Sequence, residues 1–321
     1  MKYLLALFIV IYIQAYSFAI KIDETPIFEI LDKNISDFKF LNGTRKIAIA
    51  KSYAIEFWDM DHKEKLFELP NSNESQNYCI DISSDNKFLA VGTKNGDVVL
   101  WDVELKEIIW EINITGLITD IKISPDNLYI VAGNSNSNIY KIKLFNGDIN
   151  NILEKHALDV TALEFVENGS FLISASGDKS IIIWDFEKGV SINQLKKHKS
   201  WVRDITINSE NSKMISCGDD RHLIFWNIAD LIKARPIWEE KAGLSWVSSI
   251  NYYYDMSSYV YSNIFGKIVF VSTYAKSTAY FKSTVLKVDF NPSEKTDIEM
   301  AVLIKDYGLQ IINLKRFKTK Y

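Results

Sequence analysis

Apolar and polar residues alternate along most of the chain in short runs. After about Pro26 these runs are rich in Ile, Val, Phe and Tyr, and clusters of Asn, Asp, Ser and Gly separate them. A period of two residues indicates β-strands, because successive side chains of a strand point to opposite faces. No long segment of the sequence repeats its apolar positions at the helical spacing. The pattern therefore predicts an all-β protein.

The strand pattern itself repeats, with steps of 42, 41, 42, 42, 45 and 38 residues between equivalent positions. One inward-facing apolar position recurs in every unit, at Phe38, Ile80, Ile121, Leu163, Ile205, Ile250 and Val288. A single small sheet of this kind would expose both its faces and its edges, and radial packing of several sheets buries the faces. The period predicts seven such units.

Most units end their third strand in Trp-Asp or a related pair. These endings are Trp58-Asp59, Trp101-Asp102, Tyr140-Lys141, Trp184-Asp185 and Trp226-Asn227. In these residues the chain resembles the WD-repeat (WD40) β-propeller family, whose blades repeat every 40 to 45 residues with a Trp-Asp signature. The resemblance covers residues 27 to 314; it is strong in repeats two, four and five and weak in repeats six and seven, which lack the Trp.

The resemblance implies a single seven-bladed β-propeller with four-stranded antiparallel blades, occupying residues 20–321. The blades are expected near residues 36–70, 77–113, 117–154, 156–196, 198–240, 244–281 and 283–314. The seventh unit offers only three strands. Residues 26–31 are therefore expected to supply its outer strand, so that the beginning of the folded chain closes the ring.

The amino terminus has the features of a secretory signal peptide. Lys2 precedes an apolar run at residues 4–13, and small residues stand three and one positions before a cleavage point after Ala19. The prediction is that residues 1–19 are removed. The uncharged span of residues 3–20 is 18 residues long, just short of the roughly 20 that cross a bilayer as a helix, so an uncleaved membrane anchor is the alternative.

This leader decides the expected location of the protein. With a working leader the chain enters the secretory pathway or leaves the cell, and otherwise it is cytoplasmic. Five Asn-x-Ser/Thr sequons would become glycan acceptors on the secretory route: Asn34, Asn42, Asn73, Asn113 and Asn168. Such sequons also arise by chance in a chain rich in Asn and Ser, so they do not establish secretion.

One set of residues looks catalytic, and it occurs twice. His156, Ser174, Asp178 and Trp184 recur as His198, Ser216, Asp220 and Trp226, each displaced by 42 residues. A Ser, His and Asp set suggests a hydrolase, but neither Ser lies in a Gly-x-Ser-x-Gly motif and each set includes a Trp whose N–H needs an acceptor. The two sets resemble the network that staples the strands of a WD-repeat blade, and we interpret them as structural.

The other units lack the complete set. At the position of the Asp, repeats two and three are expected to carry Asn95 and Asn134, and repeat one Ser52. These blades are predicted to be held less firmly.

A partner-binding surface is predicted from the segments that lead into the inner strands. Repeats five and six place Trp201 and Trp246 directly before the inward-facing Val, a position that in the family opens onto the top face around the channel. Two aromatic side chains on adjacent blades would form a binding hot spot. Asp159 holds the same place in repeat four, and Asp219 should lie near Trp201. The alternative is that one or both Trp pack under a loop of the neighbouring blade.

Composition excludes several other functions. The net charge of −4 lacks the basic footprint of a nucleic-acid binder. Cys79 and Cys217 are too far apart for a zinc motif or a disulfide framework, and the four His are scattered. We therefore expect no cofactor, no metal and no nucleic acid.

The sequence thus favours a non-enzymatic protein-interaction scaffold, a monomeric propeller within a larger complex, whose partners are other proteins. Two alternatives stay open. One is a luminal or secreted propeller that binds or hydrolyses a small molecule at the central channel. The other is a cytoplasmic or membrane-tethered adaptor, which contacts the membrane only if the amino-terminal segment is retained.

Overall fold

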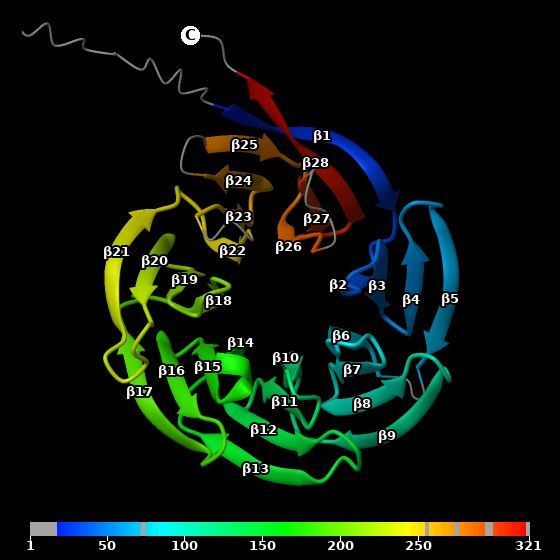
Figure 1. The fold of residues 1–321 in the computed structure, drawn as a ribbon, viewed down its shortest axis with the longest axis vertical. Helices are drawn as coiled ribbons and strands as arrows, with labels where there is room; N and C mark the ends of the chain where they lie inside the picture. Colours follow the sequence, from blue (N-terminus) through cyan, green and yellow to red (C-terminus); the bar gives the residue numbers. More distant parts are fainter. Residues whose placement is uncertain (1–17, 72–74, 254–256, 273–275, 293–297, 319–321) are drawn as a thin grey trace, which may run out of the picture.

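The computed structural model describes residues 18–71, 75–253, 257–272, 276–292 and 298–318, and these residues form 28 β-strands and one short 3-10 turn. The strands assemble into seven four-stranded antiparallel sheets arranged as a ring (Figure 1). The predicted fold, an all-β seven-bladed propeller closed by an amino-terminal strand, is confirmed.

In blades 1 to 6 the four strands follow one another in sequence from the channel to the rim, whereas in blade 7 the outer strand is β1 (Figure 1). Blades 1 and 2 are built from β2 (Ile35–Phe40), β3 (Lys46–Lys51), β4 (Ala54–Asp59), β5 (Glu64–Pro70), β6 (Asn77–Ile82), β7 (Phe88–Thr93), β8 (Asp97–Asp102) and β9 (Glu107–Asn113). Blades 3 and 4 are built from β10 (Ile118–Ile123), β11 (Tyr129–Asn134), β12 (Asn138–Lys143), β13 (Ile149–Glu154), β14 (Val160–Val166), η1 (Glu167–Gly169), β15 (Phe171–Ser176), β16 (Ser180–Asp185) and β17 (Val190–Lys196).

The remaining blades follow the same order until the ring closes. Blades 5 and 6 are built from β18 (Val202–Ile207), β19 (Lys213–Gly218), β20 (His222–Asn227), β21 (Arg235–Lys241), β22 (Val247–Tyr252), β23 (Tyr259–Asn263), β24 (Lys267–Val271) and β25 (Lys276–Tyr280). Blade 7 contains β26 (Val285–Phe290), β27 (Ile298–Ile304), β28 (Gly308–Lys318) and β1 (Phe18–Ile30).

The hairpins define two faces of the disc. We define the top face as the side of the disc that carries two kinds of segment: the loops that lead into each inner strand, and the turns between the second and third strands. The bottom face carries the turns between first and second strands and between third and fourth strands. This distinction matters because the two faces present different residues to a partner.

The core consists of apolar layers between neighbouring blades rather than of one central cluster. Met214 and Trp226 of blade 5 are buried together with Ile183 and Leu195 of blade 4. The alternating strand pattern places these side chains on the faces that meet, and burying such a side chain contributes roughly 1.5 to 3 kcal/mol. Each blade therefore depends on both of its neighbours.

The ring closes through β1, which pairs antiparallel with β28 from Ile30 opposite Leu309 to Phe18 opposite Lys318. The closing strand was expected at residues 26–31, and β1 is longer, because the ladder continues beyond Pro26. Its register shifts between Asp23 and Phe28, where Pro26 has no N–H to donate. Phe18 and Ala19 belong to this strand, whereas residues 1–17, which hold the rest of the predicted signal peptide, lie outside the described residues.

Two further observations concern the chain as a whole. Cys79 and Cys217 are free and buried. In the described part of the chain, no helix has the length and hydrophobicity of a membrane span.

Candidate functional site

The set that looks catalytic in blade 5 forms one continuous hydrogen-bonded chain. The Nδ1 atom of His198 lies 2.7 Å from Asp220 Oδ2, and its Nε2 lies 2.7 Å from Ser216 Oγ. The indole N–H of Trp226 donates to the same Oγ at 2.8 Å. The chain therefore links the entering loop, the turn after β19, and strands β19 and β20, as the family resemblance implies.

Blade 4 repeats this arrangement with nearly the same distances. His156 lies 2.9 Å from Asp178 and 2.8 Å from Ser174, and the indole N–H of Trp184 donates to Ser174 at 2.8 Å. Asp178 also accepts from the backbone N–H of Ala157 at 3.0 Å. Two blades in succession are thus fastened to their entering loops in the same way.

Burial makes these sets unsuitable for attack on a substrate. Ser174 and Ser216 are 0% exposed, and the side chains of His156 and His198 are 1% exposed. Each hydroxyl already accepts from an indole N–H, so its partners are internal. The geometry fits a staple and not a nucleophile that a substrate can reach.

The acidic end of each staple is held in its ionised form. Burial alone would raise the pKa of Asp178, but hydrogen bonds from His156, Ser180 and Ala157 outweigh burial and lower that pKa. The pKa of Asp220 is lowered in the same way, chiefly by His198. Both carboxylates therefore stabilise the fold through charge-assisted hydrogen bonds.

The strand register corrects the position expected in repeat three. Asn134 and Ser176 both end a second strand and pair with the first residue of their inner strands. Asn136, two residues later, therefore stands where Asp178 stands in blade 4. Asn134 instead accepts the backbone N–H groups of Asn136 and Asn138 and so shapes the turn. Sequence spacing alone misplaced it because Asn is frequent in this turn.

Blade 1 contains a different tether that the sequence analysis missed. Trp58 donates to Glu56 at 2.9 Å, and Lys51 lies 2.9 Å from Glu56 and 3.0 Å from Asp32. This ion chain again connects the third strand, the second strand and the entering loop. No sequence signal marked it, because its charged residues occupy positions where blades 4 and 5 carry other types.

The inner strands surround the central channel (Figure 1), and on each of them one residue directly follows the repeated apolar position. In order around the ring these residues are Lys39, Asp81, Lys122, Glu164, Thr206, Asn251 and Asp289. Neighbours of opposite charge pair with one another, since Lys39 lies 3.0 Å from Asp81 and Lys122 lies 2.6 Å from Glu164. Asp289 instead accepts from the side-chain amide of Asn251 at 2.7 Å.

Further carboxylates of the inner strands join adjacent blades. Asp120 accepts the N–H of Leu163 at 2.7 Å, and Asp204 accepts that of Ile250 at 2.9 Å. Burial raises the pKa of both, to about 6 for Asp204. Among the described residues, no group of three or more His, Cys, Asp or Glu could hold a metal ion. Carboxylates do converge on the channel, but lysines, backbone N–H groups and the side chains of Asn251 and Ser249 already bind them.

The top of the channel is shaped by a β-bulge at the start of every inner strand. The register shifts there in all seven blades, for example between Val202 and Asp204. A bulge re-aims the side chain of its extra residue. In blade 5 that residue is Arg203, which binds both carboxylate oxygens of Asp219, at 2.7 and 2.6 Å.

Trp201 lies within this arrangement and is half-buried. The guanidinium of Arg203 lies 4.8 Å from the centre of the Trp201 ring, and a Cβ on Gly177 of blade 4 would come within 2.8 Å of that ring. The backbone N–H of Asp219 donates to Trp201 O at 2.9 Å. Trp201 thus packs under the turn of the neighbouring blade, which was the alternative left open for it.

Trp246 differs from Trp201, because it is 48% exposed. Leu244 in the same loop is 85% exposed, and Phe265 in the adjacent turn of blade 6 is 72% exposed. Asp159 is partly exposed at the start of β14. The predicted surface is therefore divided: blade 6 presents apolar side chains to solvent, whereas Trp201 and Asp219 are engaged within the protein. The sequence analysis missed Leu244 and Phe265, since exposure depends on neighbouring loops.

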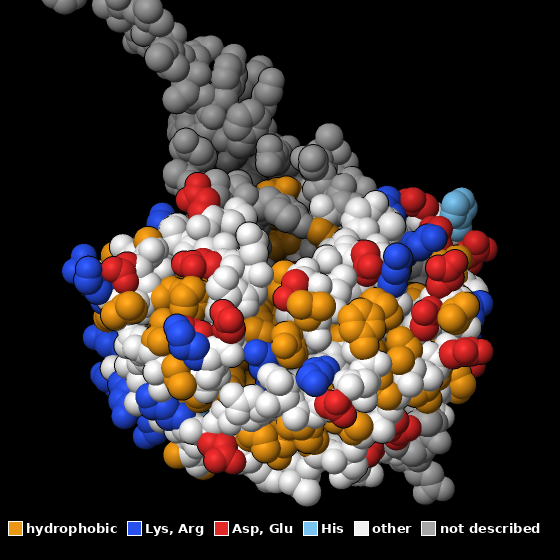
Figure 2. All heavy atoms as spheres, turned by 60° about the horizontal axis from the view of Figure 1, so that its bottom comes forward, with side chains coloured by type: hydrophobic (Ala, Val, Ile, Leu, Met, Phe, Trp, Pro, Cys, Tyr) orange, Lys and Arg blue, Asp and Glu red, His pale blue; other side chains and the backbone are white. Residues whose placement is uncertain are grey.

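Charge on the outer surface is mixed. Figure 2 shows lysine and arginine side chains gathered along one edge of the disc, on the side that carries β17 and β21 in Figure 1. Acidic residues interrupt them, since Lys197 pairs with Glu239 at 3.2 Å and Lys233 with Asp230 at 3.3 Å. A nucleic-acid backbone needs a basic surface without such partners.

Comparison with known proteins gives three segments that match the repeat family described as "WD domain, G-beta repeat", at residues 71–102, 147–185 and 189–227. These segments contain the third strands of blades 2, 4 and 5, where the Trp-Asp signature is strongest.

Several characterised proteins resemble the chain. The "Protein LST8 homolog" of Drosophila melanogaster is 26% identical over 179 residues, which cover 50% of this chain and 55% of that protein. The "WD repeat-containing protein SL1-17" of Schistosoma mansoni is 27% identical, over 46% of this chain and 50% of that protein. The "Cilia- and flagella-associated protein 337 B" of Tetrahymena thermophila is 30% identical, over 39% of this chain and 10% of that protein. The chain thus spans about half the length of the first two relatives.

Proposed function

The chain belongs to the WD-repeat β-propeller family, and from this premise we propose that it is a non-enzymatic scaffold that binds another protein on its top face. The observation that carries the proposal is the exposed apolar surface of blade 6, formed by Leu244, Trp246 and Phe265. We call this surface the blade 6 patch. Large apolar side chains held on rigid hairpins provide binding energy with little loss of conformational entropy.

The rest of the top face supports this assignment. The buried staples of blades 4 and 5 hold the turns on either side of Trp201 in place, so the face is rigid before a partner arrives. The Ser, His and Asp sets are enclosed, and the charged channel residues bind one another or, at Asp289, the amide of Asn251. These observations favour binding over catalysis.

The relatives do not name a partner. Their printed names refer to a ciliary and flagellar protein, an LST8 homolog and a WD-repeat protein, so the resemblance extends to the fold and not to one process. We take from them only the general role of a propeller that works with other proteins.

We further propose that the leader directs this scaffold into the secretory pathway. The sequence of residues 1–19 supports this, and the four sequons that the structure describes, at Asn34, Asn42, Asn113 and Asn168, are all exposed. Sequencing of the amino terminus, together with glycosidase treatment of protein from its own cells, tests the proposal. A mature chain that begins at Ile20 and carries glycan is expected; an intact Met1 on a protein without glycan contradicts it.

The top-face proposal is tested by affinity capture with two matched variants. Trp246→Ala removes the centre of the blade 6 patch, and Trp238→Ala removes a Trp on the rim that is 55% exposed. Trp246→Ala should weaken capture of the partner by about 2 kcal/mol or more, with little change in melting temperature, whereas Trp238→Ala should not. Equal loss of partner in both variants, or in neither, contradicts the proposal.

Trp201→Ala serves as a third variant, because we expect it to lose stability rather than affinity for the partner. Since Trp201 packs against Gly177 and Arg203, its removal should lower the free energy of unfolding by about 1 to 3 kcal/mol. Any loss of binding should then follow the loss of folded protein. A Trp201→Ala variant that is as stable as the unmodified protein but cannot bind would show that Trp201 belongs to the binding surface.

A further inference from the structure

The bottom face contains a groove between blades 1 and 2. The position concerned lies in the outer strand of each blade, opposite the fourth residue of the third strand. It holds Phe67, Trp110, Asn151, Asn193 and Trp238 in blades 1 to 5. In blades 1 to 4 this position faces the turn between the third and fourth strands of the next blade.

We call the contact between two neighbouring blades a seam. In two of these seams the residue at this position donates a hydrogen bond to the next blade. The indole N–H of Trp110 donates to Leu144 O at 2.6 Å, and the amide of Asn193 donates to Leu231 O at 3.0 Å. In the seam after blade 3, Asn151 lies directly against Gly189 of blade 4. Each of these side chains therefore binds or contacts the turn of the following blade.

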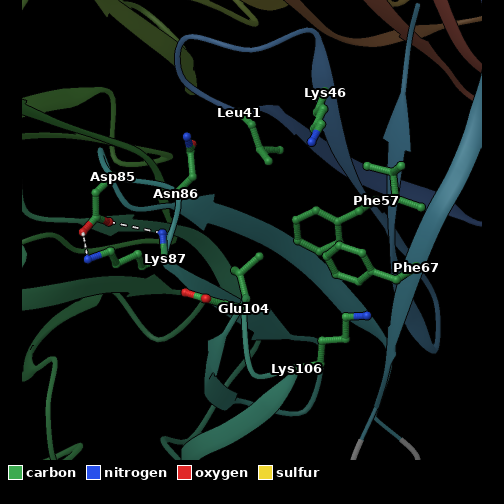
Figure 3. A pocket seen from close by; sticks show the side chains of 11 residues that line it. Leu41, Lys46, Phe57, Phe67, Asp85, Asn86, Lys87, Glu104 and Lys106 are labelled. Carbon is green, nitrogen blue, oxygen red and sulfur yellow. Dashed lines mark hydrogen bonds and ion pairs between the residues drawn. The ribbon is translucent and has the colours of Figure 1, made fainter. Parts of the chain in front are cut away.

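Phe67 cannot close its seam, because its side chain has no donor. Its ring stacks on Phe57 with the centroids 4.4 Å apart, and the ammonium of Lys106 lies 4.6 Å from its centre. The result is a cavity of about 470 Å³ between blades 1 and 2 (Figure 3). We call this cavity the blade 1–2 groove.

The floor of the groove is apolar and its rim is charged. Leu41, Phe57, Leu66, Phe67 and Val103 supply the apolar lining, and Leu66 is 38% exposed. A volume of this size suits a few side chains of a bound peptide. Solvent-exposed aromatic and aliphatic surface in a concave site favours the binding of an apolar side chain.

The charged residues around the floor carry a small net positive charge. Three lysines line the groove, Lys46, Lys87 and Lys106, against two acids, Asp85 and Glu104. Asp85 accepts from Ser83 Oγ at 2.7 Å and pairs with the Lys87 ammonium at 4.0 Å, so Lys46 and Lys106 remain against Glu104. Figure 3 shows Lys46 and Lys106 on either side of the two Phe rings. A ligand with carboxylates beside an apolar side chain complements this pattern.

We propose that the blade 1–2 groove is a second docking site, which takes an acidic peptide segment carrying an aliphatic or aromatic side chain. The apolar side chain packs against Leu66 and the exposed part of Phe67, and neighbouring carboxylates pair with Lys46 and Lys106. The carboxyl-terminal segment of this chain does not fit the groove, because residues 315–320 contain four basic residues and no acid. The occupant that we assign to the groove is an acidic segment of another protein, because its carboxylates complement Lys46 and Lys106.

This site goes beyond the proposed function and uses the opposite face of the disc. A propeller that binds one protein through the blade 6 patch and a second through the blade 1–2 groove can hold both at once. The two sites share no residues, so each can be removed separately.

The test uses fluorescence anisotropy with the full chain and a short fluorescein-labelled peptide in which a Leu-Phe pair is flanked by glutamates. A peptide with glutamines in place of the glutamates is the matched control. The acidic peptide should bind with a dissociation constant of about 1 mM or tighter. Lys46→Gln together with Lys106→Gln should weaken it about threefold to tenfold, with no effect on the glutamine peptide.

Phe67→Asn introduces the residue that closes the seam after blade 4. It should weaken both peptides by about tenfold or more, and a thermal melt shows whether the variant is folded. Lys213→Gln, far from the groove, and Trp246→Ala should change neither peptide. The lysine variants keep the proposal testable if Phe67→Asn does not fold.

Three results would overturn the proposal. They are no binding at about 1 mM peptide, equal affinity for the acidic and glutamine peptides, or binding that the lysine variants leave unchanged. Concentration-dependent self-association that Phe67→Asn abolishes would assign the groove to a second copy of this chain instead. Loss of capture in Trp246→Ala tests the top face alone, so the two proposals fail separately.

Discussion

Blade 5 and blade 1 perform the same task with different chemistry. In blade 5, Trp226 donates across to Ser216 on the neighbouring strand, and His198 carries the connection on to Asp220. In blade 1, Trp58 donates to Glu56 on its own strand, and Lys51 carries the connection to the entering loop. The first tether is fully buried, whereas the side chain of Lys51 is 21% exposed.

One substitution in the repeat explains the difference. Ser216 pairs with the residue two positions before Trp226, and in blade 1 the equivalent residue is Ile49. Ile49 has no hydroxyl, so Trp58 must find its acceptor elsewhere. Glu56, two residues earlier on the same strand and hence on the same face, supplies it. The fold therefore requires a tether at this place but not a particular set of residues.

The largest expected effect is in blade 5. Asp220→Ala leaves a buried imidazole and two backbone N–H groups without their acceptor, and should lower the free energy of unfolding by about 1 to 3 kcal/mol. Urea denaturation measures it, with Asp230→Ala, an exposed carboxylate, as the control. If Asp220→Ala were as stable as the control and lost an activity, the buried set would need to be reconsidered as a reactive site.

A smaller effect is expected in blade 1. Lys51→Met removes the ion pairs with the partly exposed Asp32 and the buried Glu56. Because Glu56 keeps Trp58 and Lys65 as partners, the change should cost about 1 kcal/mol. Salt screens such pairs, because the Debye length shortens as the ionic strength rises. The difference in the free energy of unfolding between Lys51→Met and the unmodified protein should therefore shrink between about 0.05 and 0.5 M salt. Lys33→Met is the control. A loss as large as that of Asp220→Ala would show that exposure does not separate the two tethers.

The smallest effect is the opposite pH dependence of the two tethers. The lowered pKa of Asp220 contributes stability that is present above the ordinary pKa of Asp, about 3.9, and is lost as the pH falls. Burial lowers the pKa of Lys51, but Glu56 and Asp32 outweigh burial and raise it. Its contribution is therefore present below the ordinary pKa of Lys, about 10.4, and is lost as the pH rises.

Comparing each variant with the unmodified protein isolates these contributions from other titrating groups. The destabilisation by Asp220→Asn should decrease toward acid pH, and that by Lys51→Met should decrease toward alkaline pH. Urea denaturation at several pH values provides the measurement. The same trend for both variants would argue against the assigned ionic states.

The fold was largely predictable from the sequence because its signals are periodic. Seven apolar positions at nearly equal spacing predicted seven blades, and the displacement by 42 residues identified both buried staples. The ion chain of Lys51, Glu56 and Asp32 could not be found in this way, because no other blade repeats it.

Features that depend on contacts with the adjoining blade could not be predicted from the sequence either. Trp201 and Trp246 occupy the same position in their repeats, yet only Trp246 is exposed, because Gly177 of blade 4 receives the ring of Trp201. The groove beside Phe67 likewise depends on the turn of the following blade. Repeat patterns specify the blade, and the seams between blades are specified by pairs of residues that are distant in sequence.

The pairing of β1 with β28 has a consequence for the synthesis of the protein. The two strands are separated by about 280 residues of chain, which a ribosome needs roughly 15 to 60 s to produce. During that time β1 has no partner strand. Phe28 and Ile30, which are buried in the finished ring, therefore stay exposed in an unpaired strand. The cell therefore has to protect this first strand from aggregation until the last one emerges.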